Sequence, residues 1–214
     1  IDQEIEKAKQ SVRRLEGYTS ILDTPTGATD EGIAYLKQLM MENLQFENNH
    51  YSSYFALESV KARQYFNQRG YLLIVHKDIA LRESVRYNKP QHMRAKVWED
   101  PSYASDPRKF WYYLSKQNQG VQVTPIYTDT DYSEMPMFSV TQGLYEHRSF
   151  KGVVGVNILV DTLFEDVEEK TFGDTGGVLL ADYQTGKLLT RIGPTGSTRL
   201  EFLNASERDI LTLY

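Results

Sequence analysis

The sequence predicts an α+β protein in which two amphipathic helices precede an antiparallel β-sheet of about five strands. Up to about Leu44, apolar residues recur three and four positions apart, which is the period of an amphipathic helix. From Tyr51 onward the pattern changes to short runs rich in Val, Ile, Tyr and Phe, separated by Gly, Pro, Asn and Asp. Such runs are typical of strands and turns. Helices followed by strands indicate the α+β class.

The first helix is expected to run from about Ile1 to about Ile21, with its apolar residues on one stripe. Two interpretations of this stripe stay open. It packs against the protein's own sheet, or it forms a dimer seam that continues from a membrane-spanning helix. Pro25 and Gly27 end this helix, and Thr29 or Asp30 can cap a second one. The two apolar faces comprise Ile1, Ile5, Ala8, Val12, Leu15 and Leu22, and then Ile33, Leu36, Met40 and Leu44.

The expected strands are separated by recognisable turn residues. Gly143 and the polar segment 146–149 indicate a hairpin between the last two strands of the sheet. A helix is expected over residues 108–116, before Asn118 and Gly120 end it. The strands are predicted at residues 51–57, 71–76, 121–127, 135–145 and 150–160.

A second, smaller unit is expected after Asp161. Its pattern predicts a helix over 163–170, strands over 178–182 and 187–192, and a helix over 206–213. A single hairpin is not stable alone, so this unit is either much reduced or cut off. The chain therefore divides into N-terminal helices (1–48), a sheet domain (49–160) and a reduced or truncated unit (161–214).

Composition excludes several classes of function. The chain has 214 residues with 40% hydrophobic and 25% charged content, as in a soluble globular protein. No apolar run is long enough for a transmembrane helix or a signal peptide. A net charge of −5 with dispersed basic residues argues against a nucleic-acid partner. The absence of cysteine excludes thiolate catalysis and disulfides, and it agrees with a bacterial extracytoplasmic protein.

No catalytic, metal or cofactor motif is present. The four histidines are far apart and none belongs to a His-Glu-x-x-His pattern. Asp129, Asp131 and Ser133 alternate like the start of a calcium loop, but the glycine position is Glu134 and the closing Glu is missing. Neither a Gly-x-Ser-x-Gly elbow nor a phosphate loop occurs. We therefore expect no enzyme activity, no metal and no cofactor in this chain.

The segment from Tyr103 to Asn157 holds the candidate ligand site. Aromatic rings can enclose a small molecule while cationic, phenol and amide groups orient it. On a helix, Arg108, Trp111 and Tyr112 would share one face, and on a strand Gly155 and Asn157 would share another. The alternative is that the aromatic residues only fill the core. The candidate ligand-binding residues are Tyr103, Arg108, Lys109, Trp111, Tyr112, Tyr127, Asp129 and Asn157.

These motifs resemble those of a known family. The order is a long amphipathic helix, Tyr-x4-Arg with a following Trp-Tyr, Pro-Ile-Tyr, Gly-Val-Val-Gly-Val-Asn-Ile and Phe-Gly-Asp-Thr-Gly-Gly-Val-Leu-Leu-Ala-Asp. It resembles the double Cache, PAS-like extracytoplasmic sensor domains of bacterial chemoreceptors, histidine kinases and cyclic-di-GMP enzymes. The resemblance implies a PAS-like membrane-distal domain that holds the ligand and a membrane-proximal unit that relays its state. It also implies a periplasmic or extracellular location in a membrane-anchored protein, and a homodimer through the N-terminal helix.

One branch of that family binds amino acids, and this chain departs from its pattern at two positions. The branch has one residue between the Arg and Trp-Tyr, so either Arg108 or Lys109 could hold a ligand carboxylate here. The strand Asp that would meet an ammonium group is Asn157 in this chain. Its neutral amide should favour carboxylates or neutral polar ligands over zwitterions. The expected function is sensing of a small carboxylate or amino-acid-like metabolite, and the alternative is a ligand-free dimerisation or partner-binding module.

Overall fold

The computed structural model describes residues 2–24, 27–82, 84, 86–128, 135–160, 162, 178–182, 187–193 and 196–199. The chain divides into two compact units, Ile1–Leu159 and Val160–Tyr214. The first unit contains the helices, the large sheet and the candidate site, and the second is described separately below.

The two N-terminal helices form much as expected. Helix α1 (Asp2–Thr19) continues into a 3₁₀ turn, η1 (Ser20–Asp23), and helix α2 (Asp30–Gln45) follows. The Thr29 side chain caps α2 by accepting a hydrogen bond from the Gly32 N–H at 3.3 Å. The α1 stripe is buried at Ala8, Val12 and Leu15, and α1 packs on the sheet and on α2. The stripe thus packs within its own unit, and the exposed face of α1 is polar.

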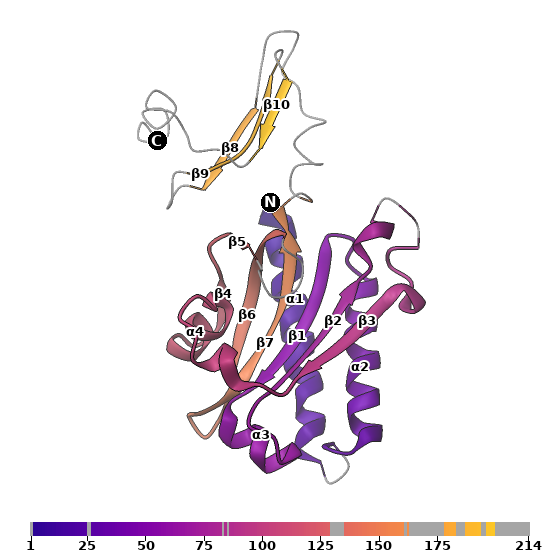
Figure 1. Cartoon of the computed structure of the whole chain (residues 1–214), viewed down its shortest axis with the longest axis vertical. Helices are drawn as coiled ribbons and strands as arrows, with labels where there is room; N and C mark the ends of the chain where they lie inside the picture. The colour runs from indigo at the N-terminus through magenta and orange to yellow at the C-terminus, as the bar shows by residue number, and fades with distance from the viewer. Residues whose placement is uncertain are drawn as a thin grey trace. The chain divides into compact units, whose positions relative to one another are not determined.

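The first unit is built on one antiparallel sheet, drawn in Figure 1 with α1 and α2 along one of its faces. Its two longest strands, β6 and β7, pair with each other, and β7 in turn pairs with β1. The strand order is β3-β2-β1-β7-β6-β4, with β5 also pairing with β6. The strands are β1 (His50–Leu57), β2 (Tyr71–Lys77), β3 (Met93–Trp98), β4 (Val121–Val123), β5 (Tyr127–Thr128), β6 (Pro136–Glu146) and β7 (Ser149–Leu159).

Two parts of this unit differ from the sequence-based expectation. The sheet has seven strands rather than about five, because β3 was missed and the predicted strand over 121–127 divides into β4 and β5. Helix α3 (Ser59–Phe66) was also missed. The predicted hairpin between β6 and β7 is present, and its tip residues His147 and Arg148 have positive φ angles of 47° and 71°.

The sheet separates a helix-packed face from a second face that holds the candidate site. Strand β1 is buried along its whole length, so both of its faces are covered. Ser53 and Phe55 point toward the α1 and α2 side, where the Ser53 hydroxyl bonds the Met40 carbonyl. Tyr54 points to the opposite side, as alternation along a strand requires. Helix α4 (Phe110–Gln117) packs on that second face.

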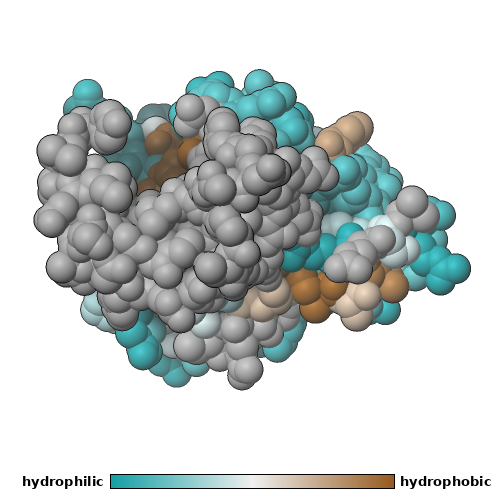
Figure 2. Space-filling view, turned by 90° about the horizontal axis from the view of Figure 1, so that it is seen from above, coloured by the Kyte–Doolittle hydropathy of each residue, from teal (hydrophilic) through white to brown (hydrophobic). Residues whose placement is uncertain are grey.

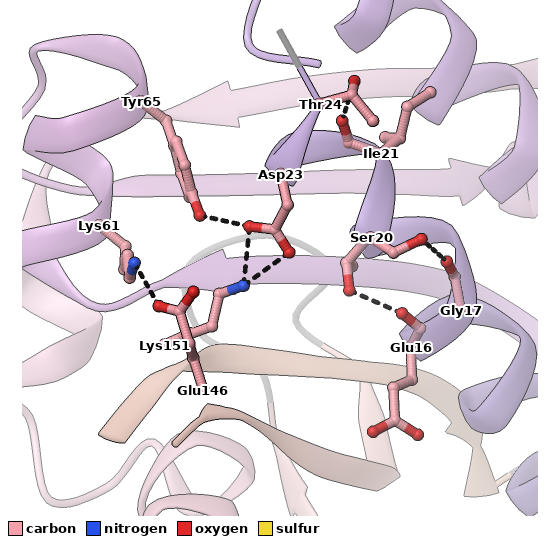
Figure 3. Close-up of polar contacts among 11 residues, drawn as sticks. Glu16, Gly17, Ser20, Ile21, Asp23, Thr24, Lys61, Tyr65, Glu146 and Lys151 are labelled. Carbon is pink, nitrogen blue, oxygen red and sulfur yellow. Dashed lines mark hydrogen bonds and ion pairs between the residues drawn. The ribbon is translucent and has the colours of Figure 1, made fainter. Parts of the chain in front are cut away.

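A polar cluster joins the end of α1 to the sheet and to α3. Lys151 on β7 donates to both carboxylate oxygens of Asp23 at 2.9 and 3.0 Å, and the Tyr65 hydroxyl donates to the same carboxylate at 2.7 Å. Figure 3 shows both groups directed at Asp23, with the Lys61 to Glu146 ion pair beside them. Burial raises the pKa of Asp23, but the hydrogen bonds from Tyr65 and Lys151 outweigh it and lower that pKa. The cluster fastens η1 to β7.

A buried histidine lies between α1 and β1. His50 is 0% exposed, and its Nδ1 is 3.4 Å from the Ser11 hydroxyl. Burial, followed by the positive charge of Lys77, lowers the His50 pKa from 6.5 to about 3, although Glu4 acts in the opposite direction. The folded protein therefore holds this imidazole neutral at pH 5 to 7.

Folding stability should fall as the pH drops below about 6.5. The unfolded chain binds a proton at His50 there and the folded protein does not, so each pH unit down toward about 3 costs about 1.4 kcal/mol. We expect urea unfolding at pH 5 to give about 2 kcal/mol less stability from this residue than at pH 7. A His50→Gln variant should lose that part of the pH dependence, while His147→Gln, at the exposed hairpin tip, should keep it. Equal pH slopes for all three proteins would contradict this assignment.

The second unit contains a three-stranded antiparallel sheet in the order β10-β9-β8. Its strands are β8 (Val178–Asp182), β9 (Lys187–Gly193) and β10 (Gly196–Arg199). The first two agree with the predicted strands, and β10 was not expected. The predicted helices over 163–170 and 206–213 lie outside the described residues.

On the face that Figure 2 shows, the coloured surface is mostly hydrophilic, with small hydrophobic areas between polar ones. The large exposed apolar side chains come from different elements: Tyr35, Phe46, Val60, Ile79, Phe110 and Val123. Within the described part of the chain, no helix combines the length and apolar character that a bilayer crossing requires.

Candidate ligand-binding site

A cavity of about 240 Å³ lies against the second face of the sheet in the first unit. It is lined by residues from β1, β2, β3, β5 and β7, from α4, and from the segment that precedes α4. This volume is just below the range of about 300–1,000 Å³ that is typical of small-molecule pockets. The lining residues are Tyr54, Leu72, Ile74, Trp98, Asp100, Ser102, Tyr103, Lys109, Trp111, Tyr127 and Asn157.

Aromatic rings form one wall of this cavity. The Trp111 ring on α4 meets Tyr54 edge-on with ring centroids 5.0 Å apart, and Tyr103 lies 6.0 Å from Trp111. The Tyr103 hydroxyl donates to the Leu57 carbonyl at 2.6 Å and accepts from the Tyr71 N–H at 3.0 Å. Burial raises its pKa to about 12, so Tyr103 stays a neutral phenol. Its hydroxyl holds the β1 and β2 backbones, and its ring faces the cavity.

A polar group from β7 reaches the cavity at Asn157. Its side-chain oxygen accepts from the Ser139 hydroxyl at 2.7 Å and from Tyr127 at 3.4 Å, and its amide donates to Ser52 at 2.9 Å. The Asn157 residue is 8% exposed. Its second amide N–H makes no hydrogen bond to a described residue. Asn157 is therefore fixed by three strands and can still offer one N–H to a ligand.

The Tyr54 hydroxyl lies directly above Gly155. A Cβ atom at position 155 would be closer to the Tyr54 ring and hydroxyl than van der Waals contact allows, so any larger residue there requires Tyr54 to move. Tyr54 is 2% exposed, and its hydroxyl has no hydrogen-bond partner among the described residues. Burial raises its pKa. A buried hydroxyl beside a cavity is a group that a polar ligand atom or a water can satisfy.

The two candidate cations have different positions. Lys109, the residue before α4, lines the cavity. Arg108 does not: its side chain is 87% exposed and pairs with Asp106 at 2.9 Å. The prediction that Arg108, Trp111 and Tyr112 share a helical face was wrong, because α4 begins at Phe110 and Arg108 precedes it. Of the two cations left open by the sequence, Lys109 is the one at the cavity.

Tyr112, also predicted as a ligand-binding residue, does not line the cavity. It is 0% exposed and packs in the core, where its hydroxyl donates to the Glu58 carboxylate. Burial and this bond to Glu58 raise the pKa of Tyr112. Because Tyr112 follows Trp111 on α4, its side chain projects about 100° away from that of Trp111 around the helix axis. Asp129, the remaining candidate, lies outside the described residues.

Several lining residues were missed by sequence reasoning. Leu72 and Ile74 alternate along β2 on the cavity side, and Trp98 and Asp100 follow from β3, the strand that was not predicted. Tyr54 lies opposite Gly155 in the pairing of β1 with β7, a register that the sequence pattern did not give. No group of three or more potential metal ligands occurs in the part of the chain that the structure describes.

The sequence matches one protein family over residues 36–165, which is more than half of the chain. The family is described as methyl-accepting chemotaxis protein-like, first PDC sensor domain. No curated protein matches the chain.

Solved structures of three proteins illustrate the fold similarity. The sensory domain of the Campylobacter jejuni chemoreceptor Tlp3 with isoleucine bound has a TM-score of 0.55 at 20% identity, over 84% of this chain and 60% of that one. The same domain is also known with L-valine. A methyl-accepting chemotaxis protein X has a TM-score of 0.57 at 20% identity, over 96% and 77% of the two chains. The extracellular domain of a histidine kinase, mmHK1S-Z3, has a TM-score of 0.54 at 16% identity, over 84% of this chain and 66% of that one. The chain thus spans about three fifths of the Tlp3 domain.

Proposed function

This chain belongs to the family of methyl-accepting chemotaxis protein-like first PDC sensor domains, and from that premise we propose that it senses a small extracytoplasmic metabolite for a bacterial transmembrane receptor. Its family is one of sensor domains and not of enzymes. The resemblance to Cache domains that the sequence motifs indicated is confirmed by this match. We further assign the sheet domain as the membrane-distal, ligand-binding unit and residues 161–214 as the membrane-proximal unit.

The observation that carries this proposal is the cavity beside Trp111. A ligand-free partner-binding module would have a solid aromatic core there, whereas this chain has about 240 Å³ of space with polar groups around it. Lys109 supplies a cation for a carboxylate, and Asn157 and Tyr127 supply neutral hydrogen-bonding groups. The ligand class that fits is a small carboxylate or amino-acid-like metabolite. The Tlp3 domain, whose structures contain isoleucine and L-valine, is a related fold with a ligand of this kind.

Lys109→Met should weaken carboxylate binding by about tenfold or more, because a hydrogen bond to a charged group contributes about 1.5–3 kcal/mol. The measurement is a thermal-shift screen of the standard L-amino acids and their amine-free acids, followed by calorimetric titration of the hits. Arg108→Met is the matched control: it also removes one cation, but from an exposed side chain outside the cavity. Equal binding by both variants would remove Lys109 from the site. A wild-type protein that responds to no acid and no amino acid would overturn the proposed function.

Signal transfer would follow from the ligand's preference for one arrangement of helix and sheet, which shifts that population. We propose that the chain acts as a homodimer on the periplasmic or extracellular side of the membrane. Because the apolar stripe of α1 is buried within its own unit, a dimer through α1 would use its polar face, which carries Gln3, Glu6, Gln10 and Arg13.

A further inference from the structure

Asp100 places a carboxylate at the cavity, and the sequence pattern did not indicate this residue. It follows β3 and caps the 3₁₀ turn η4 (Pro101–Ala104), where one carboxylate oxygen accepts the Ser102 N–H at 3.0 Å. The residue is exposed and yet lines the cavity, so it lies at the rim. Its second oxygen makes no hydrogen bond to a described residue. One carboxylate oxygen is therefore available to a ligand.

Asp100 and Asn157 lie at different sides of the cavity. Strands β2 and β1 separate β3 from β7, so three strand spacings, about 14 Å, lie between the strands that carry the two groups. The lining between them comes from apolar Leu72 and Ile74 of β2 and from Tyr54 of β1. The β7 side is neutral because Asn157 is an amide held by Ser139 and Ser52. Among the described lining residues, the carboxylate comes from Asp100, next to β3.

We propose that Asp100 receives a cationic nitrogen of the ligand, so that the site selects molecules carrying both a carboxylate and an ammonium group. This rests on the proposed function, with Lys109 as the carboxylate partner. The cavity lining then holds a cation, an anion and apolar side chains, which complement a zwitterion. The neutral amide at Asn157, taken alone, predicts exclusion of zwitterions; Asp100 reverses that prediction by supplying the countercharge at another position. The Trp98 ring beside it already makes a cation–π contact with Lys96, whose Nζ lies 4.4 Å from the ring centroid.

Asp100 also has a purely structural role as the cap of η4, and asparagine separates the two roles. Asn caps about as well as Asp, since its side-chain oxygen can accept the same backbone N–H. Asp100→Asn therefore keeps the Ser102 bond and removes only the charge. Asp78→Asn is the matched control: Asp78 caps the 3₁₀ turn η2 (Ile79–Leu81) by accepting the Ala80 N–H at 3.1 Å, and it does not line the cavity.

The experiment compares each L-amino acid that stabilises the wild type with its amine-free acid, for example L-valine with 3-methylbutanoate. In Asp100→Asn, affinity for the amino acid should fall about tenfold while affinity for the amine-free acid stays within twofold, because a charge-assisted bond is lost only where an ammonium group is present. Asp78→Asn should bind both like the wild type. A preference of wild type for amino acids that survives in Asp100→Asn would overturn the inference and leave the proposed function intact.

A second variant tests the neutral side. The variant is Asn157→Asp in the Asp100→Asn background, which moves the carboxylate from the β3 side to the β7 side. It should restore amino-acid binding only if the ligand's ammonium group can turn toward β7. Absence of restoration supports the β3 side as the position of the ammonium group. A wild type that binds amine-free acids better than amino acids would overturn the Asp100 assignment directly. Failure of every acid and amino acid to bind would instead overturn the proposed function.

Discussion

Replacing both Val12 and Leu15 with aspartate is expected to unfold the first unit at room temperature. Val12 is 0% exposed and Leu15 is 2% exposed, and both belong to the α1 stripe that packs on the sheet. Burying an unpaired carboxylate costs several kcal/mol after relaxation, and two of them match the entire stability of a typical domain, about 5–15 kcal/mol. Circular dichroism and thermal melting at pH 7 should show loss of the cooperative transition.

The control carries the same two charges on the opposite face of the helix. Gln3 and Gln10 are exposed, so Gln3→Asp with Gln10→Asp should change the melting temperature by only a few degrees. If the buried double variant melts like the wild type and has the same mass in solution, the stripe neither supports the fold nor a dimer.

Gly155→Val is expected to abolish ligand binding. The added side chain needs the space that the Tyr54 ring and hydroxyl occupy, and the cavity is the adjacent space into which Tyr54 can move. Overpacking of this kind also costs about 1–3 kcal/mol of stability. Thermal-shift and calorimetric titration with the wild-type ligand should show no binding at concentrations a hundred times the wild-type Kd.

A Tyr54 variant tests whether the clash with Tyr54 causes the effect of Gly155→Val. In a Tyr54→Ala background the same valine has room, so the destabilisation by Gly155→Val should shrink and the two effects should be non-additive. Gly17→Val, at a position on α1 with nothing near its Cβ, controls for the glycine substitution itself. Additive destabilisation in the double variant would show that Tyr54 is not the obstacle.

In the first unit, the strand pattern was clearest where the side chains are buried, and the missed strand, β3, is largely exposed. Strands β1, β6 and β7 are rich in β-branched and aromatic residues, and their pattern was clear. Strand β3 has the sequence Met-Arg-Ala-Lys-Val-Trp, and Arg94, Ala95 and Lys96 are exposed. Exposed polar residues are common in a strand at the edge of a sheet. Helix α3 buries only Ala62 fully, so it has no long apolar stripe to detect.

The candidate site residues that the sequence misplaced or missed lie next to a turn or a strand that was not recognised. Trp111, Tyr103, Tyr127, Lys109 and Asn157 were predicted, and all line the cavity. Arg108 was assigned to a helix face because Pro107 and the Asp106 side chain, which accepts the Arg108 N–H, were not recognised as the turn before α4. Asp100 was missed because its position depends on β3, and a residue that follows an undetected strand cannot be placed.

The ion pair between Asp23 and Lys151 fixes one end of helix α1 to the sheet. It holds the C-terminal end of α1, through η1, against β7, which is the strand that also carries Gly155 and Asn157. Helix α1 has 18 residues and is therefore about 27 Å long. A strand movement that tilted α1 by about 5° around this end would move its far end by about 2 Å.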